Sequence, residues 1–200
     1  MIKAIIFDFD GVIGDTFDIS FNAAIQLNPN ITKDSFVDLF VGDVYKKALE
    51  LFSQKDIPIF FEKQKKAFTR KNFFPVQPML EKLSQRYRLF IISGTVDENI
   101  NYFLSLGKLD KYFKKILGAT TSRSKLEKFK MLYNEFNFRP EECLFVTDTV
   151  GDVMDGKEAN VYTIAVSWGY HSEKLLLEHH PSAIVHSIDE LLVTIGTITK

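Results

Sequence analysis

The sequence has little of what builds disulfides, soft metal sites or a strongly charged binding surface. Its 200 residues include one cysteine, Cys143, one tryptophan and four histidines that lack metal-ligand spacing, so no disulfide can form within the chain. The formal net charge of −1 at pH 7 argues against binding to nucleic acid. No apolar run approaches the roughly 20 residues that cross a membrane. We therefore expect a globular, cytoplasmic protein without a nucleic acid or membrane partner; its oligomeric state has no sequence signal.

What the chain does contain is a repeated alternation of strand-like and helix-like patterns. We expect strands at residues 5–10, 89–92, 115–117, 144–146, 162–166 and 183–185, and helices at 98–106, 125–136, 153–159 and 188–192. Strands that alternate with helices are typical of a parallel sheet covered on both faces. The sequence therefore predicts an α/β fold with a doubly wound parallel sheet.

The stretch between the first two strands, residues 16–74, has helical periodicity and almost no strand signal. It predicts several helices, with a break near Gly42 and Pro58 in the first turn of the last one. The stretch is too long for a simple crossover helix. We expect it to be a small helical insertion in a core formed by residues 1–15 and 75–200, with hinges near 14–15 and 75–76.

Polar side chains follow three of the expected strands at the points where the strands end. Asp8 and Asp10 close the first strand, Ser93 follows the second, and Asp148 and Asp152 follow the strand at 144–146. In a doubly wound sheet these carboxyl ends open onto one crevice. Alternation along a strand would also direct Asp8 and Asp10 the same way.

Carboxylates packed this closely repel one another and resist ionisation unless a cation holds them. Oxygen ligands with little sulfur or imidazole nearby favour Mg²⁺. Lys125, at the start of the helix before the Asp148 strand, can supply further positive charge, although Lys128 and Lys130 lie in the same stretch.

With these residues in place, the chain resembles the haloacid dehalogenase superfamily, and within it the capped phosphatases related to phosphoglycolate phosphatase and β-phosphoglucomutase. The four motifs of that superfamily are matched, in order, by Asp8-Phe9-Asp10-Gly11, Ser93-Gly94-Thr95, Lys125 and Asp148-Thr149-Val150-Gly151-Asp152. The insertion at 16–74 lies where the family has a helical cap. Two features depart from the pattern: Thr147 replaces a common glycine, which is expected to crowd the pocket, and the third motif lacks its usual proline.

The residues and the resemblance imply the same reaction, the hydrolysis of a small phosphomonoester. Asp8 would attack phosphorus to form an aspartyl phosphate, and Asp10 would protonate the leaving oxygen and then activate water. Mg²⁺ would be held by Asp8, the backbone carbonyl of Asp10, Asp148 and, through water, Asp152, which can instead orient Lys125.

Ser93 and Gly94 would donate to the phosphoryl oxygens, and Lys125 would offset their charge. The expected partner is a small phosphorylated metabolite, with sugar phosphates among the candidates.

Three rival functions remain open at this point. A sugar phosphomutase would share every motif and differ in a cap that excludes water. A metal-free dehalogenase would need neither Asp10 nor the pair of Asp148 and Asp152. A phospho-accepting receiver module would carry its acceptor on a middle strand and lack the insertion.

Several other polar residues are expected to be ordinary surface groups. Arg123 reads as a loop residue and Asp155 as a surface acid. Tyr45, Lys46 and Lys47 follow Gly42 and could touch substrate, but a solvated helix face is the favoured interpretation.

Overall fold

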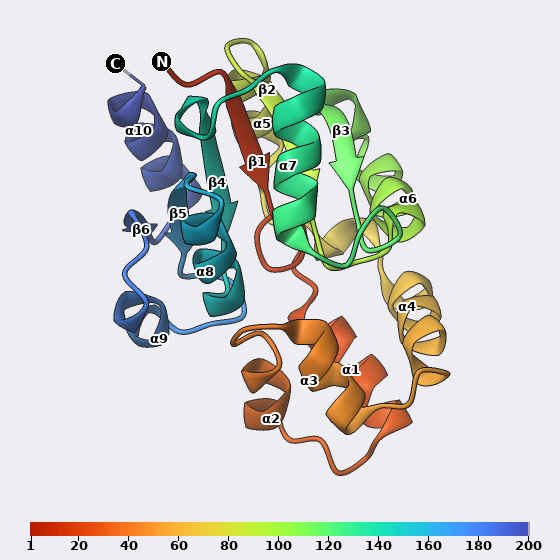
Figure 1. Cartoon of the computed structure of the whole chain (residues 1–200). Helices are drawn as coiled ribbons and strands as arrows, with labels where there is room; N and C mark the ends of the chain where they lie inside the picture. The colour runs from red at the N-terminus through yellow and green to blue at the C-terminus, as the bar shows by residue number, and fades with distance from the viewer. Residues whose placement is uncertain (200) are drawn as a thin grey trace.

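A six-stranded parallel sheet forms the centre of the structure, a computed structural model that describes residues 1–199 (Figure 1). Its strands are β1 (Ala4–Phe7), β2 (Arg88–Ile92), β3 (Phe113–Leu117), β4 (Cys143–Thr147), β5 (Tyr162–Val166) and β6 (Ala183–Val185). They are ordered β3-β2-β1-β4-β5-β6, with every neighbouring pair parallel. The predicted doubly wound α/β fold is confirmed, and β1 lies between β2 and β4, where the winding reverses.

Helices cover both faces of the sheet because each central strand is apolar on both sides. The helices that follow residue 76 are α5 (Gln77–Ser84), α6 (Asp97–Gly107), α7 (Lys125–Phe136), α8 (Val150–Glu158), α9 (Glu173–Glu178) and α10 (Ile188–Ile198), with 3-10 turns at Asp110–Tyr112 and Pro140–Glu142. In β1, Ile5 and Phe7 pack with α5, α6 and α10, whereas Ala4 and Ile6 pack on the side of α7. None of the described helices is long and apolar enough to cross a membrane.

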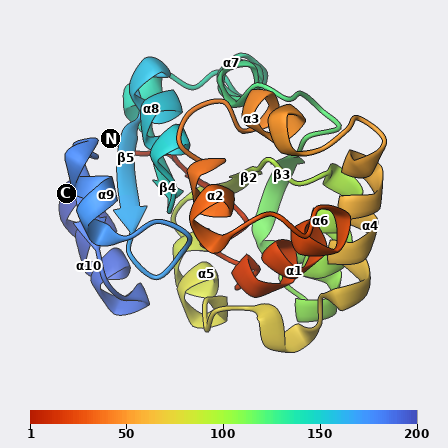
Figure 2. The ribbon, with the colours of Figure 1, turned by 90° about the horizontal axis from the view of Figure 1, so that it is seen from below.

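Residues 16–74, between β1 and α5, form a layer of helices at the carboxyl edge of the sheet (Figures 1 and 2). This inserted helical segment contains α1 (Phe17–Leu27), α2 (Lys33–Asp38), α3 (Val44–Leu51), α4 (Asp56–Ala67) and the turn Arg70–Asn72. Its helices pack around an apolar cluster of Phe36, Ala24 and Leu39, to which the core contributes Tyr170. The expected break is present: Gly42, with φ +95°, separates α2 from α3.

The two connections of this segment to the sheet lie side by side. The backbone N–H of Asp15 donates to the carbonyl of Asn72 (2.8 Å), and that of Phe74 donates to the carbonyl of Ile13 (3.2 Å). Gly14, in the first connection, forms an antiparallel β-bridge with Phe73 in the second. A Cβ at Gly14 would lie 3.0 Å from the ring of Phe9. The glycine is therefore required by this close approach rather than by a left-handed backbone.

Two boundaries at the carboxyl edge of the sheet differ from those expected, and the structure has two additional helices. Strand β1 ends at Phe7, so Asp8 and Asp10 lie in the following turn rather than on the strand. Helix α8 begins at Val150 because the hydroxyl of Thr149 caps it, which puts Asp152 in its first turn. Helices α5 and α9 were not predicted. In α5, Pro78 masked the helical signal although it stands in the first turn, where proline is tolerated.

Candidate active site

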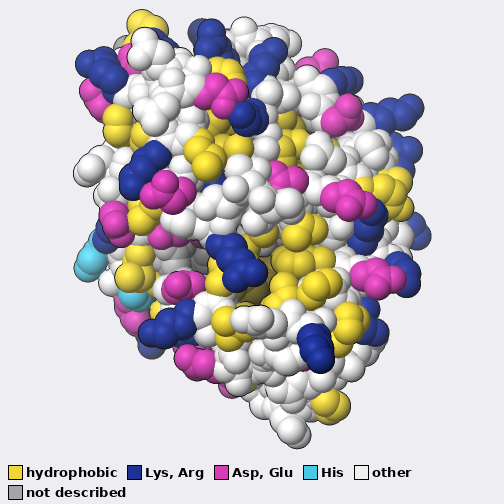
Figure 3. All heavy atoms as spheres, turned by 45° about the vertical axis from the view of Figure 1, so that its right-hand side comes forward, with side chains coloured by type: hydrophobic (Ala, Val, Ile, Leu, Met, Phe, Trp, Pro, Cys, Tyr) yellow, Lys and Arg dark blue, Asp and Glu magenta, His cyan; other side chains and the backbone are white. Residues whose placement is uncertain are grey.

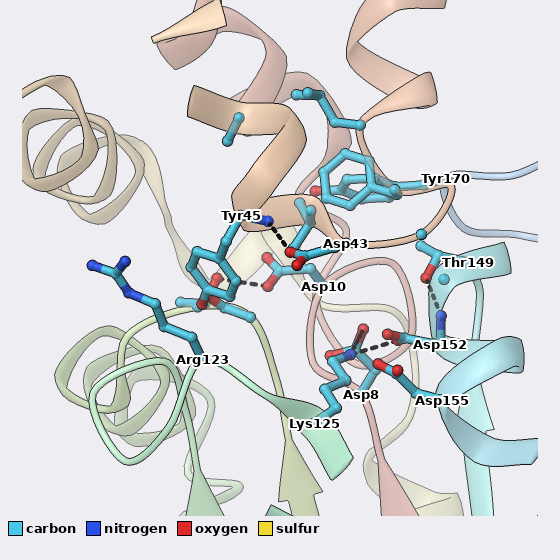
Figure 4. Close-up of a pocket in the computed structure, with 18 of the residues that line it drawn as sticks. Asp8, Asp10, Asp43, Tyr45, Arg123, Lys125, Thr149, Asp152, Asp155 and Tyr170 are labelled. Carbon is cyan, nitrogen blue, oxygen red and sulfur yellow. Dashed lines mark hydrogen bonds and ion pairs between the residues drawn. The ribbon is translucent and has the colours of Figure 1, made fainter. Parts of the chain in front are cut away.

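A cavity of about 610 Å³ lies between the carboxyl edge of the sheet and the inserted helical segment. Its floor comes from the turns after the strands and includes Asp8, Asp10, Gly94, Lys125 and Asp152 (Figure 4). The structure thus brings these five candidate residues from four segments of the chain to one place. Ser93 and Asp148 lie just beneath this surface, fully buried.

An ion-pair cluster occupies the centre of the floor. The ammonium of Lys125 lies 3.0 Å from Asp8 Oδ2 and 2.5 Å from Asp152 Oδ2. Burial raises the pKa of Asp8, and Lys125 counteracts part of that rise. Burial also acts on Asp152 and is the largest single effect, but the charge of Lys125 and the hydrogen bonds that Asp152 makes together outweigh it, so the pKa of this carboxyl is lowered. One ammonium therefore serves two carboxylates.

The side chain of Thr147 does not crowd the cavity, so that expectation was wrong. It is fully buried, and its hydroxyl donates to Asp152 Oδ2 over 2.6 Å. Where the family has a glycine, this chain has a group that fixes the position of a carboxylate.

Asp10 is the most heavily hydrogen-bonded acid of the site. Its Oδ1 accepts from the hydroxyl of Thr16 (2.8 Å) and the amide of Gln64 (3.3 Å), and its Oδ2 from Thr95 (2.7 Å) and Ser93 (3.4 Å). Burial nevertheless raises the pKa of this carboxyl, with the hydroxyls of Thr95 and Thr16 lowering it in part. A raised pKa suits a group that must hand over a proton.

Ser93 faces Asp10 rather than the open cavity. Its hydroxyl also accepts from the backbone N–H of Thr95 (3.1 Å), and its carbonyl accepts from the ammonium of Lys128 (2.6 Å). Lys128 is fully buried, which lowers its pKa to about 8, so it is not a solvated helix lysine. The two candidate lysines therefore differ in place: Lys125 joins the carboxylates and Lys128 supports the turn of the second motif.

Asp148 is held in a narrow niche with half of its hydrogen-bonding capacity unused. Its Oδ2 accepts from the backbone N–H of Tyr170 (2.7 Å), whereas its Oδ1 is buried without a partner. Only glycine fits beside it: a Cβ at Gly11, where φ is +71°, would lie 1.9 Å from Oδ2, and one at Gly169 2.3 Å. Burial raises the pKa of this carboxyl to about 8.

These features fit a hard divalent cation. No cluster of three or more acidic, histidine or cysteine side chains with metal-binding geometry occurs among residues 1–199. Mg²⁺ does not require one, because it is commonly held by one or two carboxylates together with substrate phosphate and water. The unpartnered Oδ1 of Asp148 and the raised pKa of Asp8 both indicate a deficit of positive charge.

Three residues that the sequence suggested were surface groups line the cavity instead. The hydroxyl of Tyr45 donates to the carbonyl of Gly94 (2.9 Å), and burial raises its pKa to about 12. The guanidinium of Arg123 lies 5.6 Å from the centre of the Tyr45 ring. Burial raises the pKa of Asp155, which also lines the cavity, to about 6.

The two lysines beside Tyr45 do not line the cavity. Lys46 is exposed, and Lys47 pairs with Asp38 over 2.9 Å. Helical periodicity could not show which side of α3 faces the sheet, since that depends on how the segment docks.

Backbone contacts also tie the inserted helical segment to the core. The backbone N–H of Gly151 donates to the carbonyl of Phe40 (2.9 Å). His171 bridges the same parts: its Nδ1 accepts from the backbone N–H of Val150 (2.9 Å), and its Nε2 lies 3.1 Å from the carbonyl of Val37. The two ring nitrogens of this buried histidine thus contact backbone groups, and the residue links the inserted helical segment to the core.

Comparison with known proteins gives the class first. The chain has an α/β fold with a doubly wound parallel sheet, and solved structures share this fold over nearly their whole length. A haloacid dehalogenase-like hydrolase from Streptococcus pneumoniae superposes with a TM-score of 0.83 at 21% identity, covering 97% of this chain and 98% of that one. A β-phosphoglucomutase from Clostridium difficile gives 0.78 at 20% identity, with coverages of 99% and 97%.

The family follows from the sequence. The model of the haloacid dehalogenase-like hydrolases matches residues 5–166, and the chain belongs to this family. A curated relative, the pyrophosphatase PpaX of Oceanobacillus iheyensis, is 28% identical over 98% of this chain and 97% of its own length. The resemblance drawn from the four motifs is thereby confirmed, and the protein is an enzyme of the hydrolase class.

Proposed function

We propose that this protein is a Mg²⁺-dependent phosphatase that hydrolyses a small phosphomonoester through an aspartyl-phosphate intermediate. The observation that carries the proposal is the pairing of two acids in different environments at one cavity. Asp8 lies 3.0 Å from an ammonium, whereas Asp10 accepts hydrogen bonds from the hydroxyls of Thr16 and Thr95. One is suited to act as a nucleophile and the other as an acid.

The reaction begins with attack of Asp8 on phosphorus. The backbone N–H of Phe9 donates to Asp8 Oδ1 (2.7 Å), so the carboxylate is already oriented, with Oδ2 toward Lys125. As the ester P–O bond breaks, Asp10 gives its proton to the leaving oxygen. Asp10 then takes a proton from water, which hydrolyses the acyl phosphate and frees Asp8.

Positive charge and hydrogen-bond donors stabilise the phosphoryl oxygens. Lys125 lies within the cluster, and Gly94, whose amide would donate to the phosphoryl group, lines the cavity floor. Ser93 takes part by donating to Asp10 from beneath the cavity surface. When bound, Mg²⁺ would neutralise phosphate charge. Its ligands would be Asp8, Asp148 and the carbonyl of Asp10, with Asp152 nearby.

The inserted helical segment, residues 16–74, acts in this proposal as a cap that closes over the phosphoryl site. Its adjoining connections at residues 13–15 and 72–74 would form the hinge. Closure removes water and strengthens the electrostatic interactions at the floor, and opening releases product.

A panel of phosphate compounds assayed with Mg²⁺ tests the function. We expect phosphate release from phosphomonoesters, loss of activity with a chelator and recovery with added Mg²⁺. Pyrophosphate belongs in the panel because of the curated relatives, and glucose 1-phosphate distinguishes hydrolysis from isomerisation. Full activity after exhaustive chelation, or release from no ester, would overturn the proposal.

A further inference from the structure

The side of the cavity formed by the inserted helical segment is apolar. We call this wall the roof; it consists of Val44, Ala48, Phe52, Ile57, Phe60 and Phe61. Each of these side chains keeps part of its surface accessible, unlike the fully buried side chains of β1. Figure 3 shows a hollow in the surface with hydrophobic side chains along one side and basic and acidic side chains at its rim. An open apolar wall facing a catalytic floor needs a ligand with apolar surface to cover it.

The charged residues that line the cavity disfavour the binding of a substrate with an anionic leaving group. Of its basic lining residues, Lys125 is already paired with two carboxylates, and Arg123 is exposed beside Tyr45. The acids that line the cavity outside the ion-pair cluster and Asp10 are Asp43, Asp155 and Glu158. A second phosphate or a carboxylate would therefore meet one available guanidinium, several acids and the apolar roof. Burying a charge without a partner is costly.

From this arrangement we infer the substrate class: a phosphomonoester of an uncharged, mainly apolar alcohol, whose carbon skeleton packs against the roof. The inference rests on the phosphatase function proposed above and differs from the pyrophosphate named for the curated relatives. In the reaction the ester P–O bond breaks, the alcohol leaves with the proton of Asp10, and the oxygen of water ends on inorganic phosphate.

A matched series of alkyl esters tests the inference on the unmodified protein with Mg²⁺. Ethyl phosphate and hexyl phosphate have leaving groups of similar basicity, so their difference reports apolar contact. A hexyl ester with a terminal carboxylate adds the charge. We expect kcat/KM for hexyl phosphate to exceed that of ethyl phosphate by at least about tenfold, and the carboxylate to remove that gain. Pyrophosphate should be the poorest of the four.

The outcomes distinguish the inferred substrate class from the phosphatase function on which it rests. Faster turnover of pyrophosphate, or equal kcat/KM for ethyl and hexyl phosphate, overturns the substrate class and leaves the phosphatase function intact. Turnover of none of these compounds overturns the phosphatase function itself.

Two lysine substitutions at neighbouring positions of α3 test whether the roof contacts the leaving group. Ala48 lines the cavity, whereas Leu49 is 46% exposed on the outside of the same helix. Ala48→Lys should lower the hexyl-to-ethyl ratio about tenfold or more and favour the carboxylated ester, and Leu49→Lys should leave the ratio unchanged. If a folded Ala48→Lys variant kept the ratio of the unmodified protein, the roof would not contact the leaving group.

Discussion

The floor and the roof of the cavity are built on opposite principles. On the floor, Asp8, Asp10 and Asp152 are buried acids whose oxygens are held by donors from several segments. On the roof, the side chains are apolar and half-buried, so they have no groups that could hydrogen-bond to a ligand. The floor is thus arranged for one phosphoryl geometry, whereas the roof can select by shape and polarity. A change in the floor should affect all substrates alike, and a change in the roof should affect them unequally.

The strongest test of the floor is removal of its nucleophile. Asp8→Asn should reduce kcat by on the order of 10⁴-fold or more for every ester, since the covalent step is lost. Acid-quenched reactions should also contain no phosphorylated protein. Asp34→Asn, an exposed acid on α2, is a suitable control. Undiminished turnover by the purified Asp8→Asn protein would remove Asp8 from the mechanism.

Loss of the acid should be milder. We expect Asp10→Asn to lower kcat by on the order of 10²–10⁴, the usual contribution of general acid–base catalysis. The loss should be largest for alkyl esters and smaller for p-nitrophenyl phosphate, whose leaving group needs no proton. An equal loss on both would indicate that Asp10 serves another purpose.

Asp148 should show opposite effects on stability and on metal binding. In the absence of a cation, the buried and unpartnered Oδ1 of the charged carboxylate lowers the free energy of unfolding. Asp148→Asn removes that charge and should therefore stabilise the chelated protein by about 1 kcal/mol. That corresponds to a rise of about 2–4 °C in Tm for a protein of this size.

The gain should depend on pH. Because burial raises the pKa of Asp148 to about 8 from its usual 3.8, the stability of the Asp148 protein declines as pH rises between these values. The advantage of the Asn variant should thus be greater at pH 8 than at pH 4. The variant should also lose the stabilisation by Mg²⁺ seen in the parent. Destabilisation of the chelated variant at pH 8 would contradict this account.

A single hydroxyl on the floor tests the tuning of Asp10. The hydroxyl of Thr95 donates to Asp10 Oδ2 and lowers its pKa, so Thr95→Val should raise that pKa further. Since Asp10 acts in its protonated form, the falling alkaline limb of the pH–kcat profile should move to higher pH by about one unit. Thr95→Ser keeps the donor and should leave the limb in place. A shift of the limb to lower pH in Thr95→Val would show that a different group limits the rate.

The smallest effect concerns the contact between roof and floor at Tyr45. Tyr45→Phe removes the hydrogen bond to the carbonyl of Gly94 and keeps the ring beside Arg123. We expect a change of severalfold in KM, unequal between small and large esters, with little change in kcat. Lys46→Ala, at an exposed neighbouring position, should change neither value. A uniform loss in kcat would place Tyr45 with the floor.

The floor was largely predictable from the sequence because parallel strands end at a common edge. Asp8, Ser93 and Asp148 each follow an apolar run, and in the structure these runs are the neighbouring strands β1, β2 and β4. The alternation argument for Asp8 and Asp10 was wrong in detail, since the strand ends at Phe7. A tight turn with Gly11 at positive φ brings both acids to the cavity instead.

The roof was not predictable beyond its helical character. Which face of α3 meets the cavity depends on contacts that link distant parts of the chain, such as Gly151 with Phe40 and His171 with Val37. Gln64 illustrates the difficulty: on α4 it follows a charged stretch, yet it is buried and donates to Asp10. The burial of Lys128 could not be predicted either, because a helix pattern rich in lysine predicts a solvated face.

Tyr170 joins two parts of the molecule that have been described separately. Its backbone N–H donates to Asp148 Oδ2, while its ring packs at 4.9 Å from Phe40 and 5.1 Å from Phe17, on the helical side. In the proposed mechanism, a cation bound by Asp148 would therefore act on a residue that also contacts the inserted helical segment. By thermodynamic reciprocity, the factor by which cation binding increases the population of the closed form would equal the factor by which closure increases the affinity for the cation.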